Sequence, residues 1–85
     1  MKKFEFTITD PQGIHARPAG LLVKEAKKYE STIQVFKGAR KGDLKKIFTV
    51  MALGVKQGEA VTVQVEGADE ETAAAAIEVF LRENF

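Results

Sequence analysis

The sequence predicts an α+β fold: an open-faced two-layer sandwich in which a four-stranded antiparallel sheet carries three helices on one face. Strand-like and helix-like segments follow one another in the order β-α-β-β-α-β-α. The clearest strands have one apolar and one polar face, which is typical of an antiparallel sheet with one side in water. The helices must bury their own apolar stripes, so we expect them together on the apolar face of the sheet.

The first part of the chain predicts a strand, a turn and a long helix. Residues 4–8 alternate apolar and polar side chains, which indicates a half-buried strand. Residues 10–13, Asp-Pro-Gln-Gly, have the composition of a turn. From residue 16 to about residue 28, apolar side chains recur at helical spacing, at Ala19, Leu22, Val23, Ala26 and Tyr29. We therefore expect a helix that packs on the sheet through this stripe.

The middle of the chain predicts a hairpin followed by a short helix. Residues 32–36 alternate again and indicate a second strand. A turn at residues 37–38 leads into residues 40–43, which can form only a short third strand. The apolar spacing in residues 47–51 predicts a short helix. Gly54 follows it, where helices often end in a left-handed residue.

The last part of the chain predicts a strand and a closing helix. Residues 61–66 alternate valine with polar residues and form the clearest strand pattern, which Gly67 interrupts. Acidic residues at positions 69–71 favour a helix start, because negative charge complements the helix dipole there. The buried stripe of this helix is expected at Ala73, Ala76, Ile77, Phe80 and Leu81.

Length and composition limit the classes of protein that fit. We expect a single domain over residues 1–85, given the length of 85 residues. The chain has no cysteine, and no acidic metal cluster stands out, so we expect neither a metal nor a cofactor. Residues 1–10 alternate in polarity instead of forming an apolar block, so we expect neither a signal peptide nor a membrane anchor there. No apolar run approaches the ~18 residues that span a bilayer. We therefore expect a cytoplasmic monomer that does not insert into membranes.

The net charge of +1 is unevenly distributed along the chain. Residues 1–56 hold 12 Lys and Arg and 5 Asp and Glu, a net charge of +7. Residues 57–85 hold 1 Arg and 7 Asp and Glu, a net charge of −6. If the fold gathers the first group on one face, that face would attract an acidic partner or a phosphate. The alternative is an ordinary surface, because a linear asymmetry need not become a spatial one.

The stretch GIHARPAG, residues 13–20, contains the only histidine of the chain, His15, at the start of the first predicted helix. The backbone N–H groups of Ala16 and Arg17 have no partner within such a helix and favour an anion. The Arg17 guanidinium can bind a phosphate with two hydrogen bonds. Neutral imidazole is a nucleophile near neutral pH. The pattern therefore predicts a phosphoryl acceptor, and its alternative is a helix-capping or solvent-exposed histidine without chemistry.

Two other classes of function stay open on the residues alone. A small enzyme such as a phosphatase could use His15 covalently, but it needs a water-activating group, and no carboxylate lies within the motif. A nucleic-acid-binding module would use paired aromatic residues on the open face of the sheet. The strand aromatics are Phe4, Phe6 and Phe36, and the first two are expected in the core. We therefore expect no nucleic acid partner.

The motif "GIHARPA" closely resembles the phosphorylation site of the histidine-containing phosphocarrier (HPr) family of the bacterial phosphoenolpyruvate-dependent sugar phosphotransferase system. "KKIFTVMALGV" resembles the second helix of the family, and "QGEAVTVQVEGADEETAAAAI" its last strand and helix. The resemblance implies a carrier and not an enzyme. His15 would be phosphorylated on Nδ1 by phosphorylated enzyme I and would pass the phosphoryl group to the A-domain of a sugar-specific enzyme II. Arg17 would steady the phosphate, and a regulatory, nitrogen-related branch is the alternative client.

The resemblance also implies a partner-binding surface around His15. Its residues would be Gly20, Leu21, Lys24, Lys27, Ile47, Phe48 and Met51. Many family members carry a regulatory serine at the position of Lys46, and Ser31 is the only serine of this chain. We therefore expect no serine switch at that position.

Overall fold

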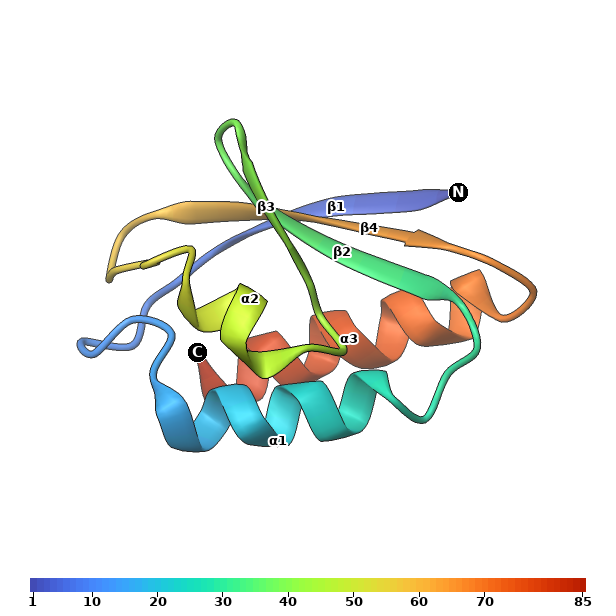
Figure 1. Ribbon diagram of the computed structural model, residues 1–85, viewed down its shortest axis with the longest axis horizontal. Coiled ribbons are helices and arrows are strands. Elements are labelled where there is room, and N and C mark those ends of the chain that lie inside the picture. Colours follow the sequence, from blue (N-terminus) through green and yellow to red (C-terminus); the bar gives the residue numbers. More distant parts are fainter.

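The computed structural model describes residues 1–85 and contains the seven predicted elements in the predicted order (Figure 1). The strands are β1 (Lys2–Thr7), β2 (Thr32–Lys37), β3 (Arg40–Asp43) and β4 (Ala60–Glu66). The helices are α1 (Ala16–Ala26), α2 (Ile47–Met51) and α3 (Glu70–Asn84). The sheet forms one layer and the helices form the other, so the predicted two-layer α+β sandwich is confirmed.

The four strands form one antiparallel sheet in the order β1-β4-β2-β3. Val63 of β4 lies opposite Phe4 on one side and Val35 on the other, so a row of apolar side chains crosses the sheet. The neighbouring Gln64 lies opposite Lys3 of β1 on one side and faces β2 on its other side. Because side chains alternate between the faces of a strand, this register gives the sheet one apolar and one polar face.

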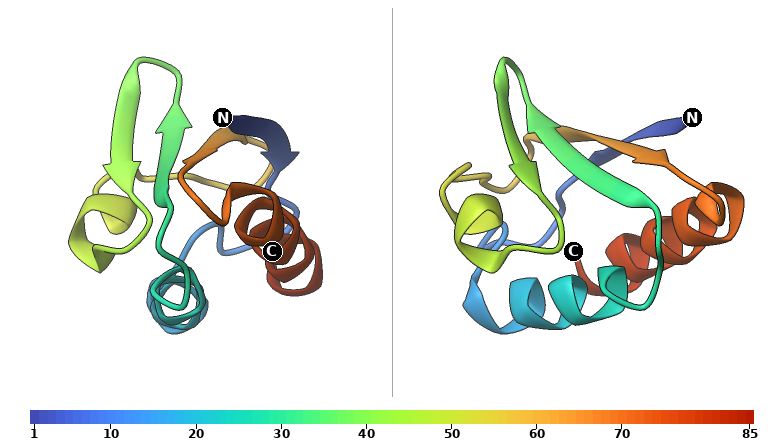
Figure 2. Two further views of the ribbon diagram at one scale, coloured as in Figure 1. Left: turned by 90° about the vertical axis from the view of Figure 1, so that its right-hand side faces the viewer. Right: turned by 45° about the vertical axis from the view of Figure 1, so that its right-hand side comes forward.

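The core fills the space between the apolar face of the sheet and the helices, which lie on one side of the sheet only (Figure 2). The fully or nearly buried residues of the two long helices are Ala19, Leu22, Val23, Ala26, Ala73, Ile77 and Leu81. Burial of a Val, Leu or Ile side chain contributes roughly 1.5–3 kcal/mol. The core therefore fixes α1, and with it the position of His15, against the sheet.

The ends of two elements differ from the expectation. α1 ends at Ala26 and not near residue 28, because the N–H groups of Lys28 and Tyr29 donate to carbonyls three residues earlier, each at 3.2 Å. Such bonds tighten the last turn of a helix. β1 ends at Thr7, and the fully buried Ile8 follows it instead of belonging to it.

A polar cluster joins the loop after α1 to the start of α3. Asp69, the N-cap residue of α3, accepts hydrogen bonds from the Ser31 hydroxyl at 2.5 Å, the Ser31 N–H at 3.0 Å and the Glu30 N–H at 2.9 Å. The Ser31 hydroxyl is the main cause that lowers the pKa of the Asp69 carboxyl. Ser31 itself is buried, so its hydroxyl has its acceptor inside the protein.

Candidate functional site

His15 is the N-cap residue of α1. Its backbone is extended (φ −121°, ψ 171°), and its carbonyl accepts the N–H of Ala19 at 3.0 Å. The imidazole makes no capping hydrogen bond, and 34% of the side chain is exposed. The backbone of His15 therefore starts the helix, while the ring is available to chemistry at the surface.

The loop that presents His15 is pressed against the connection between α2 and β4. Gly13 has a left-handed backbone (φ 67°), and the N–H of Ile14 donates to the Val55 carbonyl at 3.0 Å. A Cβ atom on Gly13 would overlap the Val55 oxygen and lie 2.8 Å from the Lys56 Cα, so only glycine fits. The position of His15 depends on this close approach.

A carboxylate lies beside the imidazole, although the motif itself contains none. The Oδ2 atom of Asp10 is 3.4 Å from His15 Nε2, and its Oδ1 atom accepts the N–H of Gln12 at 2.8 Å. The Gln12 N–H is the main cause that lowers the pKa of Asp10, and the His15 ring adds to it. Asp10 is therefore ionised at neutral pH and acts only as a hydrogen-bond acceptor.

The first turn of α1 is open to an anion. Ala16 and Arg17 are exposed, and their backbone N–H groups lie where no intrahelical acceptor exists. No acidic residue lies in this turn, and Arg17 takes part in none of the six ion pairs of the chain. The helix end and the Arg17 guanidinium thus offer positive charge that no acidic side chain pairs with directly, whereas the Asp10 carboxylate faces the imidazole.

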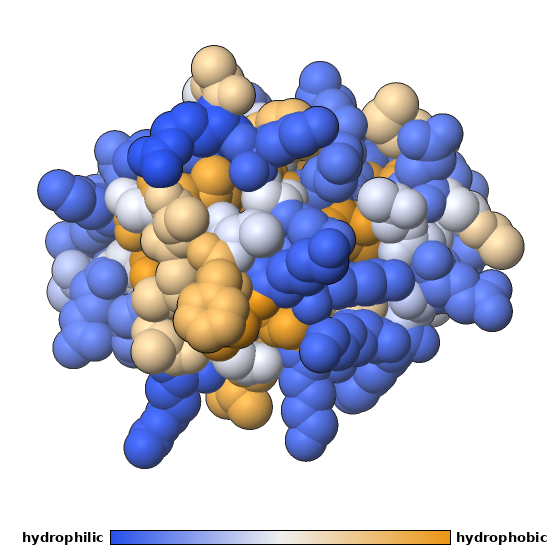
Figure 3. Space-filling model, in the orientation of Figure 1, coloured by the Kyte–Doolittle hydropathy of each residue, from blue (hydrophilic) through white to orange (hydrophobic).

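α2 lies against α1 and presents exposed apolar side chains (Figure 3). Phe48 is 86% exposed, Leu21 50% and Met51 36%. Ile47 instead packs against the core, and a Cβ atom on Gly20 would lie 3.7 Å from its Cδ1 atom, an ordinary contact. We call Gly20, Leu21, Ile47, Phe48 and Met51 the docking patch, and an exposed apolar cluster of this kind is typical of an interaction site.

The lysines around the docking patch differ in their availability. Lys24 and Lys27 are exposed on α1. Lys45 is half-buried and donates from Nζ to the Tyr29 carbonyl at 2.7 Å, so it links α2 to the end of α1. Lys46 is exposed and is the N-cap residue of α2, where it makes no side-chain capping bond.

The hairpin of β2 and β3 holds the C-terminal end of α2. Arg40 donates from Nη2 to the Ala52 carbonyl at 2.6 Å, and Lys37 donates from Nζ to the Gly54 carbonyl at 3.1 Å. Cations at this end complement the unpaired carbonyls and the helix dipole. Gly54 has the expected left-handed backbone (φ 63°). The docking patch is thus fixed by residues that lie outside it.

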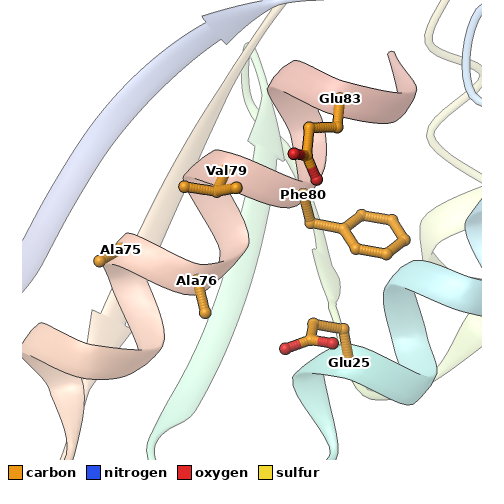
Figure 4. A pocket seen from close by; sticks show the side chains of 6 residues that line it. All are labelled: Glu25, Ala75, Ala76, Val79, Phe80 and Glu83. Carbon is orange, nitrogen blue, oxygen red and sulfur yellow. The ribbon is translucent and has the colours of Figure 1, made fainter.

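A shallow groove of about 420 Å³ lies between α1 and α3, and neither His15 nor Arg17 lines it (Figure 4). Its lining residues are Glu25, Ala75, Ala76, Val79, Phe80 and Glu83. Ala76 and Phe80 were expected in the buried stripe of α3 but are only half-buried, because they face this groove.

The open face of the sheet carries one strand aromatic, Phe36. Phe36 lacks the aromatic partner that a base-stacking platform for nucleic acid needs.

Comparison with known proteins decides the family. A family model described as the phosphorylation site of the PTS HPr component matches residues 2–83. The chain belongs to the HPr family. HPr proteins are phosphocarriers of the bacterial phosphotransferase system and not enzymes, in agreement with the expectation from the sequence.

Relatives in the HPr family match nearly the whole chain. The phosphocarrier protein HPr of Mycoplasma genitalium is 45% identical over 85 residues, 99% of this chain and 97% of the relative. A solved histidine-containing phosphocarrier protein of a mycoplasma has a TM-score of 0.93 at 41% identity, and the match covers 96% of this chain and 93% of the other. A solved HPr dimer of Thermoanaerobacter tengcongensis has a TM-score of 0.78 at 41% identity and covers 98% and 95%.

The comparisons leave the oligomeric state of this HPr family member as a prediction. The dimer among the similar structures means that the family fold alone does not decide in favour of a monomer. No helix of this chain has the length and apolar character needed to cross a membrane.

The sequence predicted His15, Arg17 and the docking patch as site residues, and the structure places them at the start of α1 and on the neighbouring surface of α1 and α2. The sequence did not single out Asp10, which contacts His15, or Arg40, which contacts the end of α2. Asp10 belongs to a stretch whose composition is explained by a turn, and the Gln12 N–H bond is indeed a turn contact. Its approach to His15 depends on the path of the whole loop. Arg40 reaches α2 across 12 residues of sequence, and no local pattern indicates such a contact.

Proposed function

We propose that this protein carries phosphoryl groups in the sugar phosphotransferase system. It accepts the group on His15 from phosphorylated enzyme I and passes it to the A-domain of a sugar-specific enzyme II. The observation that carries the proposal is the place of His15 in an HPr-family chain: a partly exposed imidazole at the open, positive end of α1. We also propose that it acts in the cytoplasm, as a single-domain monomer.

Each group around His15 has a role in this proposal. The Nδ1 atom of the ring attacks phosphorus, and the backbone N–H groups of Ala16 and Arg17 bind the phosphoryl oxygens. The exposed Arg17 guanidinium supplies a further positive charge for the same oxygens. The docking patch binds the partner proteins, and Lys24 and Lys27 attract their acidic surfaces.

A two-step transfer experiment tests the proposal. The protein is incubated with phosphoenolpyruvate and enzyme I, and the product should carry a single acid-labile phosphoryl group. The purified phosphoprotein should then lose this group to the A-domain of a sugar-specific enzyme II. If only components of a nitrogen-related branch exchanged phosphate with it, the sugar assignment would be wrong while the carrier assignment would stand.

Replacement of Phe48 by alanine should weaken binding to enzyme I. The side chain is 86% exposed, so its removal should change the stability of the free protein by less than ~0.5 kcal/mol. An aromatic residue at the centre of a docking surface typically contributes more than ~1 kcal/mol, which corresponds to at least a fivefold rise in Kd. Isothermal titration calorimetry with enzyme I measures this change.

The matched control for Phe48 is Val79→Ala. Val79 is 46% exposed but lies in α3, at the groove away from the docking patch. Its replacement should leave the Kd for enzyme I unchanged. An equal loss of affinity in both variants would show that binding does not use the docking patch specifically.

Replacement of Lys46 by serine should stabilise the fold and slightly weaken binding to enzyme I at low salt. Lys46 stands at the N-cap position of α2 without a capping bond, where serine is preferred and a cation is unfavourable. The expected gain is about 0.5–1 kcal/mol, visible as a melting temperature a few degrees higher. Lys46→Ala separates the two causes, because it removes the charge without adding a cap. The two variants should bind alike, and serine should be the more stable; equal stability would contradict the capping argument.

A further inference from the structure

The carboxylate of Asp10 is fixed in place before any phosphoryl group arrives. Its Oδ1 atom accepts the Gln12 N–H at 2.8 Å, its backbone N–H donates to the Phe85 carbonyl oxygen at 2.8 Å, and its carbonyl accepts the Gly13 N–H at 2.8 Å. These three bonds leave the Oδ2 atom directed at His15 Nε2, 3.4 Å away. The side chains of Asp10 and His15 are both half-buried, with 25% and 34% exposed, which limits competition from water.

We propose that Asp10 is a positioning residue that keeps the imidazole proton on Nε2 and so leaves the Nδ1 lone pair free to accept the phosphoryl group. This inference rests on the proposed function. An ionised carboxylate has only acceptor sites, so the ring nitrogen that faces it must carry the hydrogen. In a neutral imidazole the other nitrogen then holds the lone pair. A hydrogen bond at one nitrogen thus sets the chemistry of the other.

The same contact serves both directions of transfer. When Nδ1 attacks, a bond from Nδ1 to phosphorus forms, the bond from phosphorus to the donor breaks, and its electron pair leaves with the donor. The proton stays on Nε2, so the phosphorylated ring is positively charged, and the Asp10 carboxylate offsets that charge. When the group is passed on, the nitrogen–phosphorus bond breaks, its electron pair returns to Nδ1 and a neutral imidazole leaves. No additional proton donor or acceptor is required.

Asp10→Asn tests the inference because it replaces the hydrogen-bond acceptor that faces the ring with a hydrogen-bond donor. The asparagine Oδ1 atom can still accept the Gln12 N–H, which keeps the turn and directs the amide NH2 group at His15 Nε2. A donor at this place requires the lone pair on Nε2 and moves the proton to Nδ1, where it blocks the nucleophile. The matched control is Asp43→Asn, since Asp43 also accepts a backbone N–H, from Lys45 at 2.9 Å, but faces no histidine.

Two measurements are made on the parent and on both variants. Long-range proton–nitrogen NMR correlations of the His15 ring, at mildly alkaline pH, report which nitrogen carries the hydrogen. The initial rate of phosphorylation by enzyme I and phosphoenolpyruvate reports the chemical consequence. We expect Asp10→Asn to shift the ring towards the Nδ1–H form and to slow phosphorylation by about tenfold or more, as loss of one oriented hydrogen bond to a catalytic imidazole does. Asp43→Asn should match the parent in both measurements.

The outcomes separate this inference from the proposed function. A parent protein that accepts no phosphoryl group would overturn the proposed function. A parent that is phosphorylated, together with an Asp10→Asn variant that keeps the parent ring pattern, would overturn the role of Asp10, whether or not the rate falls. A slower rate with an unchanged ring would mean that Asp10 acts through the loop and not through the tautomer.

Discussion

His15→Ala should accept no phosphoryl group from enzyme I, while the parent accepts one. His15 is the only histidine of the chain, so no second imidazole can replace it. The backbone N–H groups of α1 and the Arg17 guanidinium remain in this variant, but they bind a phosphoryl group and cannot form a bond to phosphorus. The expected effect is therefore complete loss, measured as acid-labile radioactivity after incubation with labelled phosphoenolpyruvate and enzyme I.

The fold of His15→Ala should survive, which keeps the result interpretable. The ring makes no capping hydrogen bond, and the first bond of α1 uses the backbone carbonyl of residue 15, which alanine retains. The melting temperature should thus stay close to that of the parent. Equal labelling of the parent and the variant would remove His15 from its proposed role.

Gly13→Ala should be the most damaging single change to the fold near the site. The left-handed backbone at Gly13 costs a non-glycine residue roughly 1–2 kcal/mol. The added methyl group would also overlap the Val55 carbonyl oxygen, and overpacking of this kind costs about 1–3 kcal/mol. A total of about 2–5 kcal/mol should lower the melting temperature by roughly 10–40 °C for a chain of this length. Thermal unfolding followed by circular dichroism measures this loss.

Gly38→Ala isolates the steric part of that effect. Gly38 has a similar left-handed backbone (φ 59°), but nothing lies within 4 Å of the position that its Cβ atom would take. This variant should lose only the backbone contribution of roughly 1–2 kcal/mol. If the two glycine variants melted at the same temperature, the close approach of Gly13 to Val55 would contribute nothing to stability.

Much of the fold could be predicted because local patterns and tertiary demands agree in this chain. The alternating valines of β4 face the helices, as their period requires, and Val61, Val63 and Val65 are all buried. The predicted burial of two α3 residues and the predicted end of α1 were wrong, because tertiary contacts determine both. Ala76 and Phe80 share the helical spacing of the buried residues of α3, but α1 leaves a groove above them. The end of α1 was misplaced because Tyr29, which completes the apolar stripe, packs on the core from a turn.

The candidate site, like the fold, could be predicted from the sequence only where local patterns specify it. His15 and Arg17 lie in a contiguous motif at a helix start, so residue type, spacing and the resemblance of the motif indicated them as candidates before their positions were known. The role of Lys45 could not be predicted from local sequence, because its ammonium group binds the carbonyl of Tyr29, 16 residues away in the sequence. Asp10 was not predicted, because its contact with the His15 ring depends on the path of a loop. That loop is held by hydrogen bonds to the end of α3 and to Val55, which are distant in the sequence.

The burial of Ser31 has a consequence for how any serine phosphorylation of this protein is interpreted. The hydroxyl is 2.5 Å from Asp69, and the residue is 1% exposed, so a kinase cannot reach it in the native state. Modification would require the loop after α1 to detach from the start of α3, and a phosphate placed there would meet the Asp69 carboxylate and keep the two segments apart. Because the chain has no other serine, seryl phosphate on this protein would show that the loop after α1 had separated from α3, a local opening of the kind that amide exchange also detects.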